Sequence, residues 1–208
     1  MPTSVAAVQS QVITDPPEIL DTDTVLRQLE ELSPLLGKSR EELEKVLSDE
    51  LGRKIILLEQ SPEHHAGMFM MVTGNRTVVV ADPELGRNLI PAAEIPELPG
   101  GADFSQATQG LYDAVAKQVA AAGYRVVRIP QIPAADGKTF LTYLNVIIDC
   151  QKGKRIVYMP EYRGVEKMNQ AARKVWEGLG YEVRPIDCTN VFRQFGTLHC
   201  LVNVVERS

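Results

Sequence analysis

Apolar residues in the first quarter of the chain recur every three or four positions, the spacing of one helical face. One such stretch begins behind the cap-rich residues 21–24 and ends at Gly37. A second begins behind a capping box at 39–42 and ends at Gly52. The pattern predicts an N-terminal segment, residues 1–52, made of an irregular arm and two helices.

From residue 53 onward the pattern changes to short apolar runs separated by turns, which is typical of strands. A strand over 55–58 is followed by a hairpin whose strands, 68–72 and 77–81, flank a Thr-Gly-Asn-Arg turn. A proline-rich connection over 89–101 has too many breakers for regular structure. It leads to a helix capped by Ser105 and then to a strand over 125–130, and the apolar face of that helix holds Leu111, Val115 and Val119.

The same order of elements returns later in the chain. Strands over 140–149 and 155–159 flank a turn, and a helix over 165–179 leads to a strand over 182–186. The two Pro-Glu pairs, at 83 and 160, lie 77 residues apart, whereas the Gly-Tyr pairs, at 123 and 180, lie 57 apart, so the first copy has a connection 20 residues longer. The predicted fold class is α/β, with ββαβ units repeated over 53–208 and stacked or arranged radially.

The end of the chain is a further apolar run. Residues 195–207, entered through Gly196, predict a buried terminal strand with His199 and Cys200 at its start. Cysteine attacks as the thiolate, and a neighbouring imidazole is a common base for it. The alternative is a small core residue, the usual role of a cysteine in an apolar strand. The local sequence leaves both open.

Composition narrows the classes of partner. The 208 residues carry a net charge of -5 and the sequence pI is about 5.3, which argues against a nucleic-acid partner. No apolar run approaches the ~20 residues that span a membrane, and the first residues do not form a secretory signal, so we expect no membrane partner and a cytoplasmic protein. The three cysteines have no CxxC spacing and indicate neither a disulfide framework nor a zinc site.

Candidate chemistry gathers at the predicted strand starts. In radial repeats the starts of equivalent strands converge near the axis. The first unit places His64 and His65 there, the second places Asn145, and the chain end places His199 and Cys200. A thiolate, an imidazole and an amide together suit nucleophilic attack on a trigonal carbon.

At these residues the sequence resembles the guanidino-group-modifying superfamily, the five-bladed α/β propellers called penteins. This superfamily includes agmatine deiminases, peptidylarginine deiminases and amidinotransferases. The resemblance covers about residues 40–207. Residues 196–200 are similar to the family's G-x-x-H-C segment, 142–145 to its S/T-Y-x-N segment and 65–69 to its H-x-D-M-F segment. Three matches in order are far more specific than any one of them.

The resemblance implies a partial α/β propeller and a deiminase or amidinotransferase that acts on a small guanidino compound or an arginine side chain, with no metal or organic cofactor. Cys200 would attack the guanidinium carbon, His65 would shuttle protons and Asn145 would contact the substrate. Ammonia or an amine leaves, and water or another amine resolves the thiouronium intermediate. Gly67 and His199 would belong to the substrate-binding surface. A structural histidine at 65 and an amide bonded to turn backbone at 145 are the alternatives.

Two departures from the family pattern bear on activity. Gly67 stands where the family carries an acid, and an earlier acidic residue of the family has no counterpart here. Each lost charge-assisted hydrogen bond to a guanidinium would cost ~1.5–3 kcal/mol. Glu63 and Asp82 are the nearby acids that could compensate. A catalytically impaired relative that binds a ligand or a protein is therefore the second hypothesis, and a thiol hydrolase on another fold is the third.

Length raises a related question. Five units of this size need well over 208 residues, so about two blades are missing. Three arrangements would account for this: the C-terminal part of a longer protein, a split protein completed by a partner chain, or a reduced propeller whose open edges pair in a homo-oligomer. The sequence does not specify the substrate, because specificity depends on surrounding loops.

Overall fold

The computed structural model describes residues 37, 39, 41, 42, 45, 46, 49, 58–151 and 153–202. The predicted arm, the first predicted helix up to residue 36, strand residues 55–57 and the chain end after residue 202 lie outside them. The capping box of the second predicted helix is confirmed. The Glu42 backbone N–H donates to Ser39 Oγ (3.2 Å), and the Ser39 N–H donates to Glu42 Oε2 (2.7 Å).

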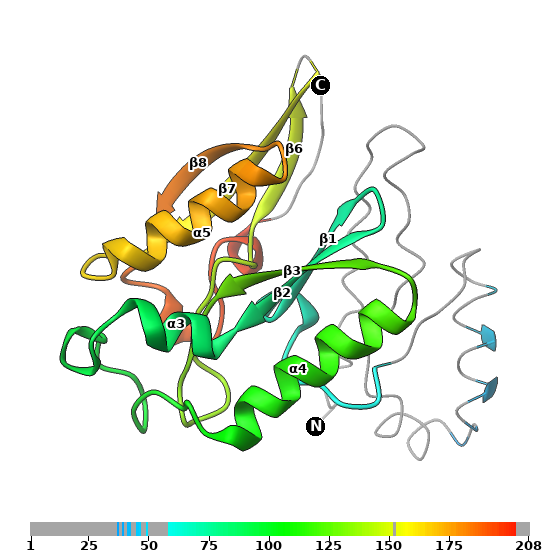
Figure 1. Cartoon of the computed structure of the whole chain (residues 1–208), viewed down its shortest axis with the longest axis horizontal. Helices are drawn as coiled ribbons and strands as arrows, with labels where there is room; N and C mark the ends of the chain where they lie inside the picture. The colour runs from blue at the N-terminus through cyan, green and yellow to red at the C-terminus, as the bar shows by residue number, and fades with distance from the viewer. Residues whose placement is uncertain are drawn as a thin grey trace.

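The first ββαβ unit is a three-stranded sheet with a long helix beside it (Figure 1). The 3₁₀ turn η1 (Ala66–Met68) leads into the antiparallel strands β1 (Met70–Gly74) and β2 (Thr77–Asp82). Helix α3 (Pro83–Leu89), the 3₁₀ turn η2 (Ala92–Glu94) and helix α4 (Gln106–Ala121) follow, and β3 (Arg125–Pro130) pairs parallel to β2. The Ser105 hydroxyl accepts a hydrogen bond from the Thr108 N–H, which confirms the predicted start of α4.

The second unit repeats this order. Strands β6 (Ile147–Gln151) and β7 (Lys154–Glu161) are antiparallel, helix α5 (Glu166–Gly178) follows, and β8 (Glu182–Asp187) pairs parallel to β7. A small sheet of β4 (Ile132–Pro133) and β5 (Phe140–Leu141) joins the units, and the 3₁₀ turns η3 (Phe192–Gln194) and η4 (His199–Leu201) follow β8. The fold is therefore mixed α/β, with two ββαβ units as predicted.

Strand pairing shows which residues of the two units are equivalent. Thr77 of β2 pairs with Arg125 of β3, the first residue after a Gly-Tyr pair, and Ile156 of β7 pairs with Glu182 of β8 in the same way. Positions 77 and 156 differ by 79, whereas positions 125 and 182 differ by 57, so the insertion has 22 residues and not the 20 expected. The two Pro-Glu pairs are thus offset by two residues in the fold.

The insertion contains a helix, α3, that the sequence pattern did not predict. Asp82 ends β2 and its Oδ1 accepts a hydrogen bond from the Leu85 N–H, while Pro83 takes the first helical position. An aspartate cap followed by proline is a sequence signature of a helix start. The helix therefore begins directly at the end of the strand, and the proline-rich stretch behind it holds only the short turn η2.

The predicted single strand over 140–149 is instead broken between β5 and β6. The Thr142 hydroxyl donates to the Met68 carbonyl (2.9 Å) and accepts from the Leu144 N–H (3.2 Å). A hydroxyl that bonds backbone in this way competes with strand pairing. Residues 140–146 are all buried, so their hydrophobic character reflects burial and not one continuous strand.

The prediction of a buried terminal strand is wrong for the described residues 195–202. The backbone forms η4, and the side chains of Leu201 and Val202 are 61% and 41% exposed. The backbone N–H groups of His199 and Cys200 donate to two oxygens of Asn145. These donors are satisfied by one residue of the second unit, so this segment coils against that unit.

Helix α5 packs between the two units, against β3 of the first and against β7 and β8 of its own (Figure 1). Trp176 of α5 is fully buried, and its indole N–H donates to the Tyr143 carbonyl (3.1 Å). A fully buried tryptophan with a satisfied N–H combines a large apolar contact area with a directional bond. This side chain ties α5 to the loop between β5 and β6.

Arg155 makes a second contact between the units. Its guanidinium stacks on the Tyr181 ring, 4.1 Å from the centroid, and donates to the carbonyls of Leu179 (3.3 Å) and Thr73 (2.6 Å). Thr73 lies in β1, so the second unit reaches the first. Arg76, at the equivalent position of the first unit, stacks on its own Gly-Tyr tyrosine at 5.1 Å, which shows that the arginine-tyrosine pair is part of the repeat.

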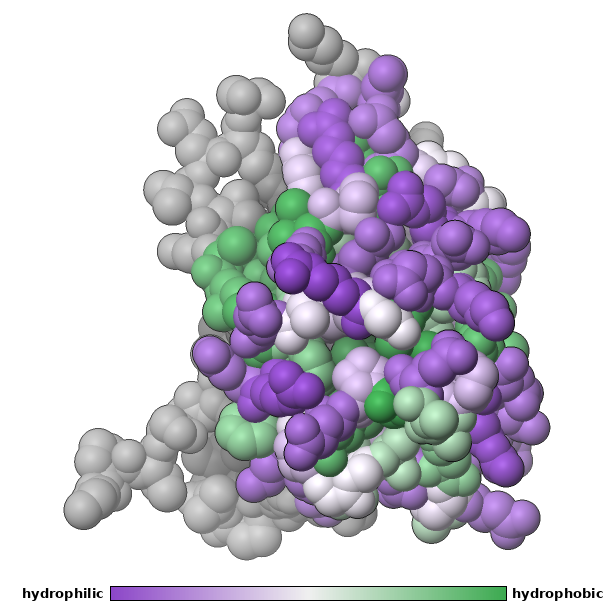
Figure 2. Space-filling model, turned by 90° about the vertical axis from the view of Figure 1, so that its left-hand side faces the viewer, coloured by the Kyte–Doolittle hydropathy of each residue, from purple (hydrophilic) through white to green (hydrophobic). Residues whose placement is uncertain are grey.

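The surface carries both polar and apolar side chains. Figure 2 shows hydrophilic and hydrophobic residues interspersed on the face that it presents. Several large apolar side chains near the described chain end are exposed, including Phe195, Leu201 and Val202. Within the described residues, every helix is too short or too polar to cross a membrane.

Replacing Arg155 by lysine should lower the free energy of unfolding by about 1–3 kcal/mol, because an ammonium group cannot stack on Tyr181 and donate to two carbonyls at once. Arg184→Lys is the matched control. Arg184 lies 5.7 Å from the Tyr158 ring centroid, but its side chain is 42% exposed, so we expect a loss below about 0.5 kcal/mol. Urea denaturation measures both values, and equal losses would contradict the inter-unit role of Arg155.

Candidate functional site

Asn145 lies at the centre of the candidate site, in the loop before β6, and is only 2% exposed. Its side-chain Oδ1 accepts hydrogen bonds from the Cys200 backbone N–H (3.2 Å) and from the Thr197 hydroxyl (3.0 Å). Its backbone carbonyl accepts from the His199 N–H (3.2 Å). One buried residue therefore holds the turn that carries the candidate nucleophile.

The segment around η1 approaches Asn145 from the first unit. A Cβ built on Gly67 would lie 3.7 Å from Asn145 Nδ2. The next residue, Met68, is fixed by the hydrogen bond from Thr142 to its carbonyl. The structure thus brings together residues 67–68, 142–145 and 197–200, three segments that the sequence analysis expected to converge.

Cys200 has an exposed side chain on the turn η4, so water and small molecules can reach its thiol. The turn depends on two neighbours. Phe195 adopts the left-handed conformation (φ 62°), and a Cβ on Gly196 would lie 2.9 Å from Cys200 Cβ and 3.0 Å from its Sγ. Glycine at 196 is therefore required by the close approach of the cysteine side chain and not by an unusual φ of its own.

His65 is the candidate that the structure does not bring into contact with the thiol. Its side chain is exposed, and its ring lies 4.9 Å, centroid to centroid, from the ring of His64. Its backbone carbonyl accepts a hydrogen bond from the Met68 N–H (2.8 Å). His65 is thus the residue that precedes η1, two positions before Gly67. Among the contacts of the described residues, none joins the His65 imidazole to Cys200 or Asn145.

The two other histidines are half-buried. His64 packs edge-on against Phe140 at 5.2 Å, and its Nδ1 is buried with no hydrogen-bond partner among the described residues. Burial, and to a smaller extent the neighbouring His65, lowers the pKa of His64 to about 4. Burial also lowers the pKa of His199. Both imidazoles are therefore held in the neutral form near neutral pH.

The cysteines differ in accessibility. Cys188 is buried, and burial followed by the charge of Asp187 raises its pKa to about 11, so its thiolate is scarce near neutral pH. Cys150 is half-buried in β6. Cys200 is the exposed cysteine of the three, which favours it as the reactive thiol.

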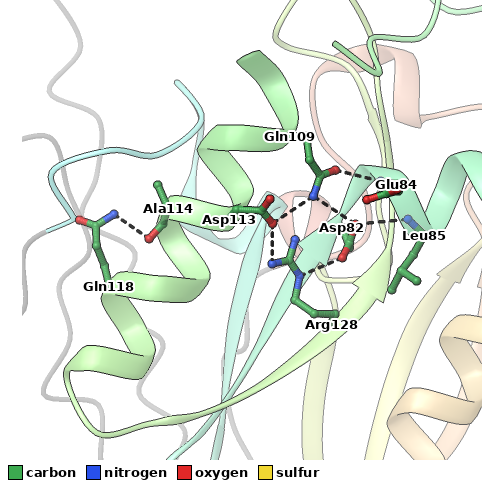
Figure 3. Close-up of polar contacts among 8 residues, drawn as sticks. All are labelled: Asp82, Glu84, Leu85, Gln109, Asp113, Ala114, Gln118 and Arg128. Carbon is green, nitrogen blue, oxygen red and sulfur yellow. Dashed lines mark hydrogen bonds and ion pairs between the residues drawn. The ribbon is translucent and has the colours of Figure 1, made fainter. Parts of the chain in front are cut away.

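Asp82 cannot replace the acid that Gly67 lacks, because other groups occupy it (Figure 3). Its carboxylate caps α3 and forms an ion pair with Arg128 (3.2 Å), which also pairs with Asp113 (3.0 Å). Gln109 bridges both carboxylates, at 3.4 Å and 3.0 Å. Within the described residues, no cluster of three His, Cys, Asp or Glu side chains is arranged to hold a metal ion.

Two hydroxyls that organise the site were missed by sequence reasoning. Thr142 fixes the carbonyl of η1, and Thr197, which is fully buried, donates to Asn145. Both lie inside motif segments that were noted for other residues. Both also lie inside strands that the sequence predicts, 140–149 and 195–207, so the pattern gave no signal for these roles.

Comparison with known proteins places this arrangement in a family. Residues 36–204 match the family model described as Porphyromonas-type peptidyl-arginine deiminase. The chain belongs to this family. The predicted resemblance to the guanidino-group-modifying penteins is thereby confirmed. No curated protein matches the sequence.

Solved structures of deiminases show the same fold. Agmatine deiminase from C. jejuni aligns with a TM-score of 0.61 at 16% identity, covering 86% of this chain and 50% of that one. A Porphyromonas gingivalis protein assigned as an arginine deiminase gives a TM-score of 0.61 at 24% identity, with 86% and 52% covered. Enterococcus faecalis agmatine deiminase gives 0.57 at 21% identity, with 85% and 52% covered. The family member described here spans about half the length of these structures.

His64 makes the stability of this deiminase-family chain sensitive to acid. In the unfolded chain its pKa is near 6.5 and in the folded chain about 4, so the unfolded state binds more protons between these values. The free energy of unfolding should therefore fall as the pH decreases from about 6.5 to about 4. His64→Gln should show a shallower fall in this window, measured by urea denaturation. Above pH 7 the two curves should run parallel, and identical slopes below pH 6.5 would contradict the prediction.

Proposed function

We propose that this deiminase-family chain performs covalent chemistry on guanidino compounds through Cys200. The Cys200 thiolate adds to the guanidinium carbon, the C–N bond to the leaving group breaks, and ammonia or an amine departs with a proton. Water or another amine then attacks the thiouronium carbon, which returns the thiol and releases a ureido product or a transferred amidine. Membership of the family and an exposed thiol held beside Asn145 support this proposal.

The observation that carries the proposal is the hydrogen bond from the Cys200 N–H to Asn145 Oδ1 (3.2 Å). This bond joins the Cys200 backbone to the Asn145 amide, although the two residues are 55 positions apart in sequence, and it supports a shared site for them. In this proposal His65 transfers protons, and Gly67 and His199 belong to the surface that receives the substrate. His65 would complete the site when a substrate is bound, because catalytic contacts often tighten only in that complex.

A partner or further blades would complete the site. The chain spans about half of the deiminase structures that it matches. We propose that the remaining blades come from further sequence of the same protein, from a partner chain or from a second copy of this chain. A closed propeller would then surround Cys200.

A second candidate function is ligand or protein binding without turnover. The observation that favours it is Gly67, which supplies no carboxylate next to Asn145 at the position where the family carries an acid. Of the two nearby acids, Asp82 is engaged with Arg128 and Glu63 is exposed. A relative of this kind would keep the fold and bind its ligand without catalysing the reaction.

Chloroacetamidine should label Cys200 in preference to the other two cysteines, because an amidinium beside a reactive thiol mimics a guanidino substrate. We expect a rate at Cys200 roughly tenfold or more above that at Cys150, and little reaction at Cys188, whose thiol is buried. Peptide mass spectrometry measures the rates, and neutral iodoacetamide normalises them for exposure alone. Equal normalised rates would favour the binding function.

Gly67→Asp should raise the formation of ureido product, or the transfer of an amidine, from a guanidino compound that carries no carboxylate of its own. The added Cβ meets only Asn145 Nδ2 at 3.7 Å, so the side chain fits without displacing backbone. A carboxylate facing a guanidinium contributes ~1.5–3 kcal/mol, which corresponds to an increase of about tenfold or more. Gly67→Asn is the neutral control of the same size and should not raise the rate. If Gly67→Asp leaves activity unchanged in a steady-state assay, position 67 does not face the substrate.

A further inference from the structure

The orientation of the Asn145 amide is fixed by its partners. A backbone N–H can only donate, so the atom that faces the Cys200 N–H must be the amide oxygen, Oδ1. The Thr197 hydroxyl donates to the same oxygen. The amide nitrogen, Nδ2, therefore lies on the other side of the group and presents its two N–H donors away from the Cys200 turn.

Those donors face Gly67. The nearest atom to a Cβ built on Gly67 is Nδ2, at 3.7 Å, and no hydrogen bond from Nδ2 is found among the described residues. Asn145 as a residue is only 2% exposed, but its Nδ2 atom is not fully buried, so water can reach this donor. An acceptor oxygen placed beside Gly67 would take the hydrogen bond that Nδ2 otherwise makes to water.

Glycine leaves the space for that oxygen open. Gly67 is half-buried and has no side chain, and its φ lies outside the left-handed region, so the backbone does not itself require glycine there. The space left by the missing side chain of Gly67 therefore lies next to the hydrogen-bond donor Asn145 Nδ2. A ligand oxygen can take the place that a side-chain carboxylate would take.

We propose that a carboxylate of the substrate itself occupies the space beside Gly67 and accepts a hydrogen bond from Asn145 Nδ2. The proposal rests on the proposed function and narrows its substrate class to guanidino compounds that carry their own carboxylate a few bonds from the guanidinium carbon. The substrate then supplies the negative charge that stabilises its guanidinium. A guanidino compound without a carboxylate leaves both the donor and the cation unpaired.

Protection of Cys200 from alkylation tests this without requiring turnover. The full chain is treated with iodoacetamide in the presence of guanidinoacetate, which carries a carboxylate, or of agmatine, which carries none, and the modified Cys200 peptide is quantified by mass spectrometry. Guanidinoacetate should give half-maximal protection at a concentration about fivefold or more below that of agmatine, because a charge-assisted hydrogen bond is gained. Cys150 in the same sample reports non-specific effects.

Two variants at position 67 distinguish the effect of adding a negative charge from the effect of filling the space. In Gly67→Asp the side chain takes the carboxylate position, so guanidinoacetate is repelled and agmatine should become the better protector. In Gly67→Asn the space is filled by a neutral group, so guanidinoacetate should lose its advantage without agmatine gaining one. Preserved preference for guanidinoacetate in Gly67→Asp would overturn the proposal.

The outcomes in the unmodified chain are distinct. Agmatine protecting as well as guanidinoacetate, or protection by neither, overturns the carboxylate site. Protection by guanidinoacetate with no product formed from either compound supports the carboxylate site and contradicts the proposed catalytic function. The two proposals can therefore fail separately.

Discussion

Asn145 accepts three hydrogen bonds from residues 197–200, and the position of the Cys200 thiol depends on them. A single hydrogen bond contributes about 1 kcal/mol net, but a buried donor left without its partner costs about 1–3 kcal/mol. Since Thr197 is fully buried and Asn145 nearly so, these contacts are expensive to break. They hold residues 197–200 in a turn that leaves the Cys200 side chain exposed.

The site is built where the two repeated units meet. The first unit supplies the turn η1, the second supplies the loop between β5 and β6, and the Thr142 hydroxyl joins them at Met68. Farther away, α5 and the Arg155 guanidinium hold the same two units together. The relative position of Gly67 and Asn145 is therefore a consequence of how one unit packs on the next.

The charged side chains of the first unit lie in a network apart from the candidate site. Two acids of the first unit are used structurally: Asp82 caps a helix and pairs with Arg128, and Asp113 pairs with the same arginine. What the site offers is an amide donor, a thiol and half-buried neutral imidazoles at His64 and His199. Position 67 supplies no side-chain carboxylate, so a ligand there meets the amide donor of Asn145.

By itself the sequence determined the two ββαβ units, their repeat and three motif segments, because alternation, helical spacing, caps and glycine turns act over a few residues. It also led correctly to the family. Only the tertiary structure decided that 140–149 is broken, that residues 199–201 form a 3₁₀ turn, and that Asn145 bonds Cys200 while the His65 ring lies against His64. The reason is that an apolar run is equally compatible with a strand and with a turn until distant partners satisfy its polar groups. Here the Met68 carbonyl accepts from the Thr142 hydroxyl, and Asn145 accepts from the backbone N–H groups of His199 and Cys200.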